Sequence, residues 1–350
     1  MARARWTLLA VVAALAIGVT GCGSGESGTT VRKIAFVAPY GDNEPDWTLR
    51  AQEVVREFPR YLGIRVDTVD ASQTSDIRGA LAQVSHERNQ LVIAHDGRYA
   101  AAAEAVAGET KVPELVWGEG TSARRGLVGH ITVQDKEAGY MAGIVAAHAA
   151  ITRRLAVIVL ADGSAWDTAT WNRMAGGFAA GAHSVDPTEQ VKYVQVGQNG
   201  SATVEEVHDV ALRLLKSGSQ MIFTLGGRST LGALRAVEQQ QGENQFISVI
   251  GDKSAFNREN YVLESVMYEF KPAFEQAIED LRRGRFGKHP YELTLRNRGV
   301  YILPTGRTPL DAYEAAIAAQ RKIERGQLRV PETSTSEAVQ ALLAGQTPQG

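Results

Sequence analysis

Short apolar runs rich in β-branched residues alternate along the chain with longer segments of helical period. The runs predict strands at Lys33–Val37, Arg65–Val69, Leu91–Ala94, Glu114–Trp117, Gly129–Val133, Leu155–Leu160, Val191–Val196, Met221–Leu225 and Ser248–Gly251. The helical periods are Trp47–Leu62, Ser75–Glu87, Arg98–Ala107, Glu137–His148, Ala169–Val185, Thr203–Ser217, Thr230–Gln240 and Pro272–Arg283. This alternation predicts right-handed βαβ units with parallel sheets covered on both faces, and its two successive sets predict an α/β protein of two doubly wound lobes.

The C-terminal part carries fewer signals. Gly299–Leu303 is expected to be a returning strand and Pro309–Arg325 a helix with an Ala-rich face. Thr335–Gly345 has a hydroxyl cap and a terminal glycine, which favour a short closing helix. A loose tail over the last twenty residues is the alternative.

The first thirty residues have the pattern of an export signal. A cationic start at Arg3 and Arg5 precedes the apolar run Trp6–Ala16 and the small residues Val19–Gly21, which end at Cys22. The run is shorter than the about 20 apolar residues that span a bilayer, so we interpret it as a lipoprotein signal peptide. Cleavage before Cys22 would leave its thiol to carry lipid, at the start of a flexible tether over residues 22–30. An ordinary signal peptide with a chance cysteine is the alternative.

Composition narrows the class of protein. With 44% apolar and 22% charged residues, the 350-residue chain suits a well-buried globular fold. A formal net charge of −2 with scattered basic residues gives no footprint for nucleic acid. Cys22 is the only cysteine, which excludes an internal disulfide and a cysteine metal cluster. The seven histidines show no metal-ligand spacing and no nucleophile motif occurs, so we expect no metal, no cofactor and no enzyme.

Ligands of doubly wound sheets bind beyond the carboxyl ends of the strands, so the residues after each strand are the candidates for a binding site. Four tryptophans, Trp47, Trp117, Trp166 and Trp171, are predicted at or just past strand ends, two in each lobe. A flat ligand between facing lobes would cover this apolar area, which suggests a clamp. The alternative is that each ring packs locally against its own helix. Tyr40 and Tyr99 are predicted in the same layer.

Polar groups accompany these rings. His95 and Asp96 follow the third strand, Glu119 the fourth, Asp162 the sixth and Asp252 the ninth. Carboxylates there can accept hydrogen bonds from sugar hydroxyls or ring N–H groups, whereas Asp46 and Asp167 are by default helix caps. Gly226 and Gly227, before Arg228, let the backbone approach a ligand. This turn lacks the ending of a phosphate loop and the third glycine of a dinucleotide fingerprint.

Several motifs resemble a known family. Ile131–Gly143, reading ITVQDKEAGYMAG, resembles the crossover segment of the basic membrane protein family, the substrate-binding lipoproteins of nucleoside-type ABC transporters. Arg173–Gly181, reading RMAGGFAAG, resembles its second-lobe helix. The Gly226–Gly227 turn, the Ile250–Asp252 strand end and the Ser265–Met267 crossover follow in the family's order. The similarity runs from about Lys33 to Phe286.

The resemblance implies a type I periplasmic-binding-protein fold with three crossovers between the lobes. It implies that a base stacks between two aromatic rings. Trp47 stands at the position of the first ring. Met174, which has no ring, stands at the second, and Trp166 or Trp171 from the same region could supply the missing ring. It assigns the ribose-binding aspartate to Asp252. Tyr268 stands where the family usually has a lysine, with Lys271 close by, and Gly118 with Glu119 adjacent stands at the base-reading aspartate.

The expected domain boundaries follow from the signal, the strand pattern and this resemblance. They are 1–21 for the signal peptide, 22–30 for the tether, 31–133 with 268–298 for the N-terminal lobe, 134–267 with 299–326 for the C-terminal lobe, and 327–350 for a tail or short helix.

The predicted function is a lipid-anchored, monomeric solute-binding lipoprotein on the extracytoplasmic face of the cell membrane, which delivers a small molecule to an ABC permease. A nucleoside ranks first as ligand; a free base, a flavin-like ring or another small polar molecule stays open. A sensor of the same fold that signals without transport is the alternative, and a surface hydrolase using Asp96, Glu119, Asp162 and Asp252 is a remote one. The candidate ligand-binding residues are Tyr40, Asp46, Trp47, His95, Asp96, Trp117, Glu119, Trp166, Trp171, Met174, Gly226, Gly227, Arg228, Asp252 and Tyr268.

Overall fold

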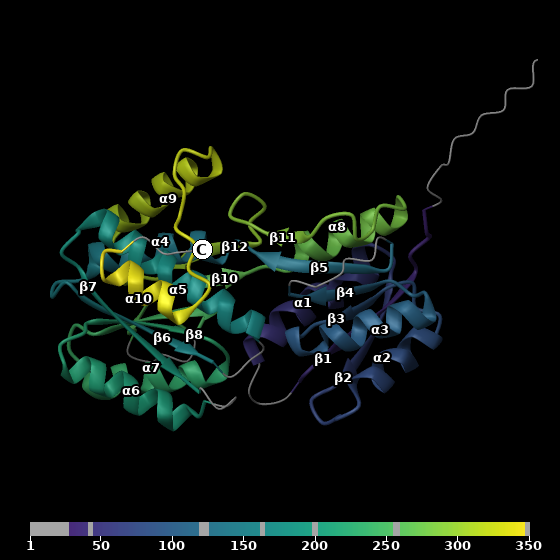
Figure 1. Ribbon diagram of the computed structural model, residues 1–350, viewed down its shortest axis with the longest axis horizontal. Helices are drawn as coiled ribbons and strands as arrows, with labels where there is room; N and C mark the ends of the chain where they lie inside the picture. Colours follow the sequence, from purple (N-terminus) through teal and green to yellow (C-terminus); the bar gives the residue numbers. More distant parts are fainter. Residues whose placement is uncertain are drawn as a thin grey trace, which may run out of the picture.

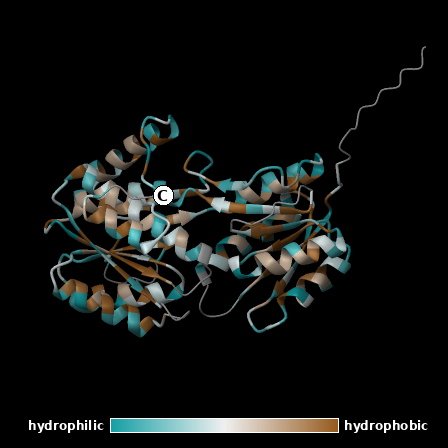
Figure 2. Cartoon of the chain, in the orientation of Figure 1, coloured by the Kyte–Doolittle hydropathy of each residue, from teal (hydrophilic) through white to brown (hydrophobic). Residues whose placement is uncertain are grey.

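Two lobes lie side by side, each built around a six-stranded sheet with helices on both faces (Figure 1). The computed structural model describes residues 28–40, 45–118, 126–161, 165–197, 202–254 and 260–346. This is the α/β architecture of two doubly wound sheets that the sequence pattern predicts. Apolar residues fill the strands, and the helices turn polar residues outward (Figure 2). Among the described residues, no helix is both long and apolar enough to span a membrane.

The N-terminal lobe contains an entirely parallel sheet. Its strands, in spatial order, are β11 (Tyr291–Leu293), β5 (Val128–Val133), β4 (Glu114–Trp117), β3 (Val92–Ala94), β1 (Lys33–Ala38) and β2 (Arg65–Asp70). Helices α1 (Pro45–Tyr61) and α8 (Lys271–Arg282) cover one face, where Phe274 contacts Phe36 and Phe58. Helices α2 (Ile77–His86) and α3 (Ala100–Thr110), the latter preceded by the 3₁₀ turn η1 (Gly97–Tyr99), cover the other.

The C-terminal lobe has a sheet that is parallel except at one edge, where β12 pairs antiparallel with β10. Its strands, in spatial order, are β12 (Val300–Pro304), β10 (Val262–Tyr268), β9 (Gln245–Ile250), β8 (Met221–Leu225), β6 (Arg154–Leu160) and β7 (Gln190–Val196). The covering helices are α6 (Val204–Lys216) and α7 (Leu231–Gln240), which follows the turn η2 (Arg228–Thr230), on one face, and α4 (Asp135–Ala149) and α5 (Ala165–Val185) on the other. Helices α9 (Leu310–Glu324) and α10 (Ser336–Leu343) pack on α4 and α5 respectively.

Helices α4 and α5 pack with their backbones almost in contact, because glycine lines the crossing. A Cβ added at Gly139 would lie 2.0 Å from the carbonyl oxygen of Met174, and one at Gly177 would lie 2.0 Å from that of Lys136. No other residue fits such an approach without displacing a helix. The first turns of α4 are therefore held at a fixed spacing from the middle of α5.

The chain passes between the lobes three times. It crosses from β5 to α4, from β10 to α8, and from β11 to β12. One hydrophobic core runs through this junction, from Phe36 and Phe58 in the first lobe to Phe178 and Val157 in the second. The two lobes therefore share a continuous apolar core.

The strands and helices expected from the pattern are present, with small shifts at their ends. Strands β10 and β11 are additions. The sequence pattern indicates only a crossover at β10, because Glu264 and Ser265 interrupt its apolar run, and β11 is only three residues long. Thr335 caps α10 by accepting from the backbone N–H of Ala338 at 3.2 Å, so the segment is a helix rather than a loose tail up to Leu343.

Candidate functional site

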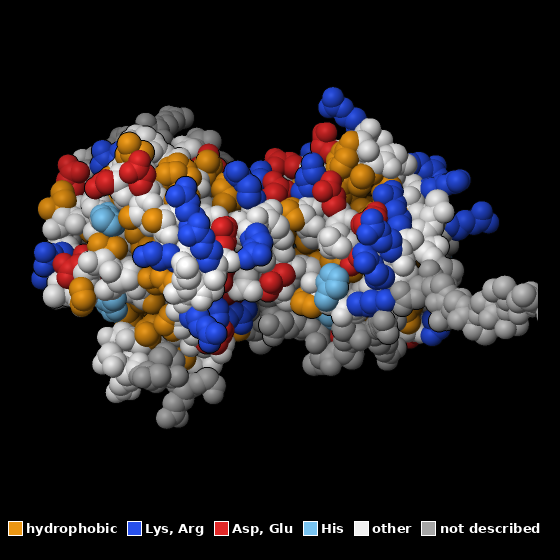
Figure 3. Space-filling model, turned by 90° about the horizontal axis from the view of Figure 1, so that it is seen from above, with side chains coloured by type: hydrophobic (Ala, Val, Ile, Leu, Met, Phe, Trp, Pro, Cys, Tyr) orange, Lys and Arg blue, Asp and Glu red, His pale blue; other side chains and the backbone are white. Residues whose placement is uncertain are grey.

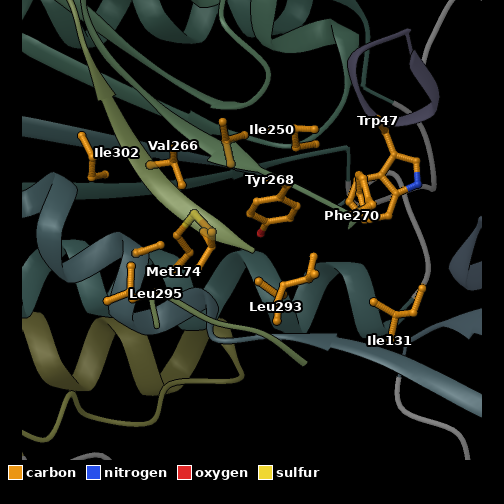
Figure 4. Close-up of a cluster of buried hydrophobic side chains, with 14 of the residues drawn as sticks. Trp47, Ile131, Met174, Ile250, Val266, Tyr268, Phe270, Leu293, Leu295 and Ile302 are labelled. Carbon is orange, nitrogen blue, oxygen red and sulfur yellow. The ribbon is translucent and has the colours of Figure 1, made fainter. Parts of the chain in front are cut away.

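Five rings meet where the strands of the first lobe end, and we call them the aromatic cluster: Trp47, His95, Trp117, Tyr268 and Phe270. Three of them, Trp47, Tyr268 and Phe270, are labelled in Figure 4. Trp47 is central. It stacks on His95 with 4.9 Å between ring centroids and meets Trp117 edge-on at 4.3 Å. The indole of Trp47 is only 7% exposed and that of Trp117 only 2%. The cluster is therefore a packed unit, with rings that approach in the edge-on and stacked arrangements aromatic groups prefer.

Local structure explains why these rings converge. Trp47 lies in the first turn of α1, His95 follows β3, and Trp117 is the last residue of β4. Tyr268 ends β10 of the other sheet, and Phe270 precedes α8 on the return to the first lobe. Carboxyl ends of parallel strands share one edge of a sheet, so both lobes contribute rings to the same place.

Two buried polar atoms inside the cluster have no hydrogen-bond partner among the described residues: Nδ1 of His95 and the hydroxyl of Tyr268. The other ring nitrogen of His95 lies 3.4 Å from the backbone oxygen of Trp47. Burial lowers the pKa of His95 to about 3, so the imidazole is neutral. Burial also raises the pKa of Tyr268, and the charge of Asp135 adds to that effect. An unsatisfied buried polar group costs about 1–3 kcal/mol, so both atoms reduce the stability of the packed cluster.

Two direct bonds join the lobes beside the cluster. The ammonium of Lys253, 1% exposed, lies 2.8 Å from a carboxylate oxygen of Asp46, and the indole N–H of Trp117 donates to Asp167 at 3.2 Å. Gly251 packs against Asp46 so closely that a Cβ there would lie 3.1 Å from the Cβ of Asp46. The lobes are thus in contact, with a charge from the segment after β9 of one meeting the first turn of α1 of the other.

The backbone that carries Lys253 is strained. Ile250, the last residue of β9, has φ +71°, a left-handed conformation that is a genuine outlier for a β-branched residue. Such conformations cost about 1–3 kcal/mol and persist where the surroundings impose them. Here the turn brings Lys253 inward, where its ammonium also donates to the carbonyl of Val249 at 3.1 Å.

A cavity of about 680 Å³ lies at the first crossover, with walls from both lobes, and we call it the crossover cavity. From the second lobe, Asp135 is bonded to Arg173 at 2.7 Å, yet burial raises the pKa of Asp135 to about 7. From the first lobe, His130 is 6% exposed, and its ring nitrogens make no hydrogen bond with the described residues. Burial lowers the pKa of His130, and Glu104, 3.9 Å away, opposes that shift. Basic and acidic side chains alternate along the surface over the middle of the molecule (Figure 3).

A family model described as "ABC transporter substrate-binding protein PnrA-like" matches residues 32–330. The chain belongs to this family. The resemblance found in the sequence is thereby confirmed. Proteins of this family are extracytoplasmic substrate-binding components of ABC transporters, so this chain is a solute-binding protein whose partners are a small molecule and a permease.

Solved structures share the fold at low sequence identity. A solute-binding protein of an ABC transporter system from Conexibacter woesei is 19% identical, with a TM-score of 0.69 over 87% of this chain and 99% of that one. One from Aeropyrum pernix is 14% identical, with a TM-score of 0.72 over 90% and 97%. A transcriptional activator of the comK gene from Bacillus halodurans is 15% identical, with 0.68 over 91% and 100%. A search of curated protein sequences gives no match.

Several predicted site residues lie in the junction of this solute-binding protein. Trp47, His95, Trp117 and Tyr268 form the aromatic cluster, and Asp46 forms the ion pair across the lobes. Met174 is fully buried in the same core as Tyr268 (Figure 4), and Trp171 is buried on the same helix. Gly226 has φ +145°, and a Cβ there would lie 2.6 Å from that of Leu160, so the turn after β8 is confined to glycine.

Other predicted residues have contacts within their own lobe. Asp96 caps η1 and binds the guanidinium of Arg98 at 2.5 and 2.8 Å. The exposed carboxylate of Asp252 accepts from Ser254 at 2.8 and 2.9 Å. Arg228 is exposed at the start of η2, after Gly227. Tyr40 packs toward Gln52 of α1 and Thr68 of β2, where burial raises its pKa to about 12.

The remaining predicted residues lie outside the described part of the structure: Cys22, Glu119, Asp162 and the side chain of Trp166. Sequence reasoning missed Lys253, Phe270 and the Asp135–Arg173 pair, and it interpreted Asp167 as a helix cap, although its carboxylate accepts from Trp117. A lysine directly after a buried strand end, in Gly251–Lys253, was the available signal for the first.

Proposed function

We propose that this chain is the solute-binding lipoprotein of an ABC importer and that its solute is a nucleoside or a related aromatic, sugar-bearing molecule held between the lobes. The observation that carries the proposal is the aromatic cluster, in which rings from both lobes meet at the carboxyl ends of their strands. Stacking of a base on an aromatic side chain contributes about 1–3 kcal/mol. A planar, weakly polar ring is therefore the group that this layer favours.

The polar groups around the rings suit the sugar of a nucleoside. Nδ1 of His95 and the hydroxyl of Tyr268 are buried atoms of the cluster that have no hydrogen-bond partner among the residues the structure describes. Asp46 and Asp167, which reach across the junction, are acceptors of the kind that sugar hydroxyls use. Discrimination would rest on these polar contacts, since a site built to hydrogen-bond a hydroxyl rejects an analogue without it.

Capture follows from the equilibrium between separated and joined lobes. Separation breaks the Asp46–Lys253 and Trp117–Asp167 bonds and uncovers Trp47. A solute that contacts both lobes favours the joined form by the difference between its affinities for the two forms. The permease would then recognise the joined pair of lobes.

The membrane attachment in this proposal depends on Cys22. The signal-like sequence before it supports cleavage at this residue and lipid on its thiol. Mass spectrometry of the protein extracted from membranes should give a mass for residues 22–350 plus lipid. A Cys22→Ser variant should lack the added mass, and an unmodified Cys22 in the membrane form would contradict the anchor.

Calorimetry on the purified mature protein tests the solute, with a panel of nucleosides, free bases, sugars and flavins. Nucleoside binding should weaken by about 1–3 kcal/mol in Trp47→Ala. Trp47→Phe, which keeps a ring, is the matched control and should lose less. Native mass spectrometry of protein purified without refolding would identify a retained molecule. Binding only of a compound without an aromatic ring would refute the ligand assignment.

A further inference from the structure

The end of the N-terminal lobe opposite the aromatic cluster is where the described chain begins. The backbone N–H of Thr29 donates to the carbonyl of Leu281, at the end of α8, with a distance of 3.2 Å. Thr29 and Leu281 also line a cavity of about 530 Å³ together with Gln90 and Lys111, from the loops before β3 and β4. The start of the chain is thus fixed among the loops that precede the strands.

Five basic residues surround this point, and we call them the basic rim: Arg32, Arg65, Arg88, Lys111 and Arg282. Backbone contacts place the first three together. The N–H of Arg65 donates to the carbonyl of Arg32 at 2.9 Å, and the side chain of Gln90 bridges the N–H of Arg32 and the carbonyl of Arg88. Four of the five are exposed and Arg282 is half-buried.

The acidic residues of this end are largely neutralised within it. Asp67 pairs with Lys33 at 2.5 Å, Glu279 with Arg283 at 2.6 Å, and Asp280 with Arg285 at 2.9 Å. Glu87 differs, because its carboxylate accepts from the uncharged amide of Gln83 at 3.4 Å. Within the described parts of the chain, no carboxylate pairs with Arg32, Arg65, Arg88 or Arg282.

The excess of positive charge is therefore local to this end, because the whole chain has a formal net charge of −2. Figure 3 shows it at the right-hand end of the molecule, where blue side chains gather and red ones are sparse.

The short segment between Cys22 and the first described residue, Gly28, indicates that the basic rim would face the membrane. Six peptide units separate Cys22 from Gly28, and they span at most about 20 Å when fully extended. A lipid on Cys22 would hold this end of the lobe that close to the bilayer. Basic side chains interact with an anionic membrane surface when they lie within a Debye length of it, about 8–10 Å. The segment between Cys22 and Gly28 is short enough for the basic rim to come within this distance.

We propose that the basic rim rests on the anionic phosphate headgroups of the membrane that anchors the protein. The proposal relies on the lipid anchor proposed above. Contact through the rim would orient the lobe, because strands β1 to β5 begin at the rim and end at the aromatic cluster. The cluster would stand about one strand length, roughly 20 Å, farther from the headgroups.

The test separates the rim from the anchor by using protein without lipid. The chain from residue 22 with Cys22→Ser keeps every described residue, and it is sedimented with vesicles of phosphatidylcholine alone or mixed with phosphatidylglycerol. We expect binding to the anionic vesicles at low salt, loss of it at high salt, and none to phosphatidylcholine. Equal binding to both vesicle types, or none to either, would overturn the proposal.

Charge reversal then locates the contact. Loss of three basic residues alone lowers the partition constant about 100-fold, at about 5-fold each, so Arg32→Glu, Arg65→Glu and Arg88→Glu together should lower it by at least that factor. The matched control reverses Arg213, Lys216 and Arg321, exposed basic residues of α6 and α9 in the other lobe, and should keep nearly full binding. An equal loss in the control would show attraction to total charge and contradict a rim contact.

Failure of the rim and failure of the anchor give different results. Lipid on Cys22 is detected by the mass of the membrane-extracted protein, whatever the vesicles show. A lipidated protein whose unlipidated form ignores anionic vesicles would retain the anchor and refute the rim.

Discussion

The two lobes bring different chemistry to their shared junction. The first lobe brings three rings to the junction, Trp47 from the start of α1 and His95 and Trp117 from strand ends, whereas the second lobe has glycine directly after two of its strands, Gly226 and Gly251. Apolar rings bury the surface of a ligand without fixing its orientation, because the hydrophobic effect has no direction. Glycine turns let the backbone come close to a ligand, where backbone groups and nearby charges can fix its orientation. The first lobe is thus suited to hold a flat group, and the second to position it.

The contrast extends to charge. The buried cation at the junction, Lys253, comes from the second lobe, and its carboxylate partner Asp46 comes from the first turn of a helix in the first lobe. The pair therefore forms only when the lobes meet. Trp47, in contrast, mostly contacts rings of the first lobe, His95 and Trp117, and Phe270 on the crossover from β10 to α8. Substitutions on the two sides should separate these contributions.

The largest effect is expected at Trp117. Trp117→Ala removes the ring packed against Trp47 and the donor to Asp167, and it should lower the free energy of unfolding by about 4 kcal/mol. Urea unfolding measures this loss. Trp117→Phe, which keeps most of the apolar area, should lose less. An equal loss in both variants would mean that the hydrogen bond, rather than the ring, stabilises the junction.

Removing the cation of the second lobe comes next. Lys253→Met leaves the carboxylate of Asp46 without its partner and should cost about 3 kcal/mol, since breaking a buried pair costs about 3–5 kcal/mol and Asp46 retains some contact with solvent. Lys136→Met, which breaks the more exposed Lys136–Glu332 pair, is the control and should cost at most about 1 kcal/mol. Equal losses of unfolding free energy in Lys253→Met and Lys136→Met would contradict a larger contribution from the buried pair.

The ring of His95 gives the first lobe a pH dependence. Its pKa is about 3 in the folded protein against an ordinary value of 6.5, so below pH 6.5 the unfolded chain binds a proton that the folded one does not. Its contribution to stability is full above pH 6.5 and falls toward pH 3, by about 2 kcal/mol at pH 5.

His95→Phe should remove this part of the slope in urea unfolding at pH 5 and pH 7.5. His86→Gln, at an exposed histidine, is the control and should keep the slope. Burial raises the pKa of Glu114 to about 9, which gives a slope of opposite sign, so the comparison is between variants and not between pH values alone. An unchanged slope in His95→Phe would exclude His95 as its source.

The smallest effect concerns the glycine turn of the second lobe. Gly226→Ala places a Cβ at φ +145° and within 2.6 Å of Leu160, and it should lower the free energy of unfolding by about 1.5 kcal/mol. Gly306→Ala, where nothing lies within 4 Å of an added Cβ, should change it by less than about 0.5 kcal/mol. Thermal unfolding of the two variants is sufficient, and equal midpoints would contradict the close approach.

The alternation of strands and helices could be predicted because buried parallel strands read as continuous apolar runs. Strand β10 escaped this rule since it buries two polar residues. Ser265 is satisfied by the hydroxyl of Ser248 at 2.9 Å, and burial raises the pKa of Glu264, which favours its neutral form. A sequence pattern predicts polar residues of this kind at the surface, and their burial becomes evident only when the neighbouring strands are in place.

The candidate site could be predicted to the level of the strand ends and no finer. Trp47 and Trp117 were placed there correctly, but the choice between Asp252 and Lys253 depends on which of two adjacent side chains points inward. That direction is set by the left-handed conformation of Ile250, which no local propensity indicates. The rings of Tyr268 and Phe270 depend on a crossover whose path is a tertiary property.

The three crossovers also determine the order in which the protein can be completed. The sheet formed by residues 33–133 lacks β11 and α8 until the chain reaches Leu293, so Phe36 and Phe58 remain uncovered by Phe274 while residues 134–268, which contain most of the second lobe, are made. An early segment of this kind exposes apolar surface and a free strand edge. The lobe that comes first in the sequence is thus finished late, and a chain stopped near residue 150 is an aggregation-prone fragment rather than half of a protein.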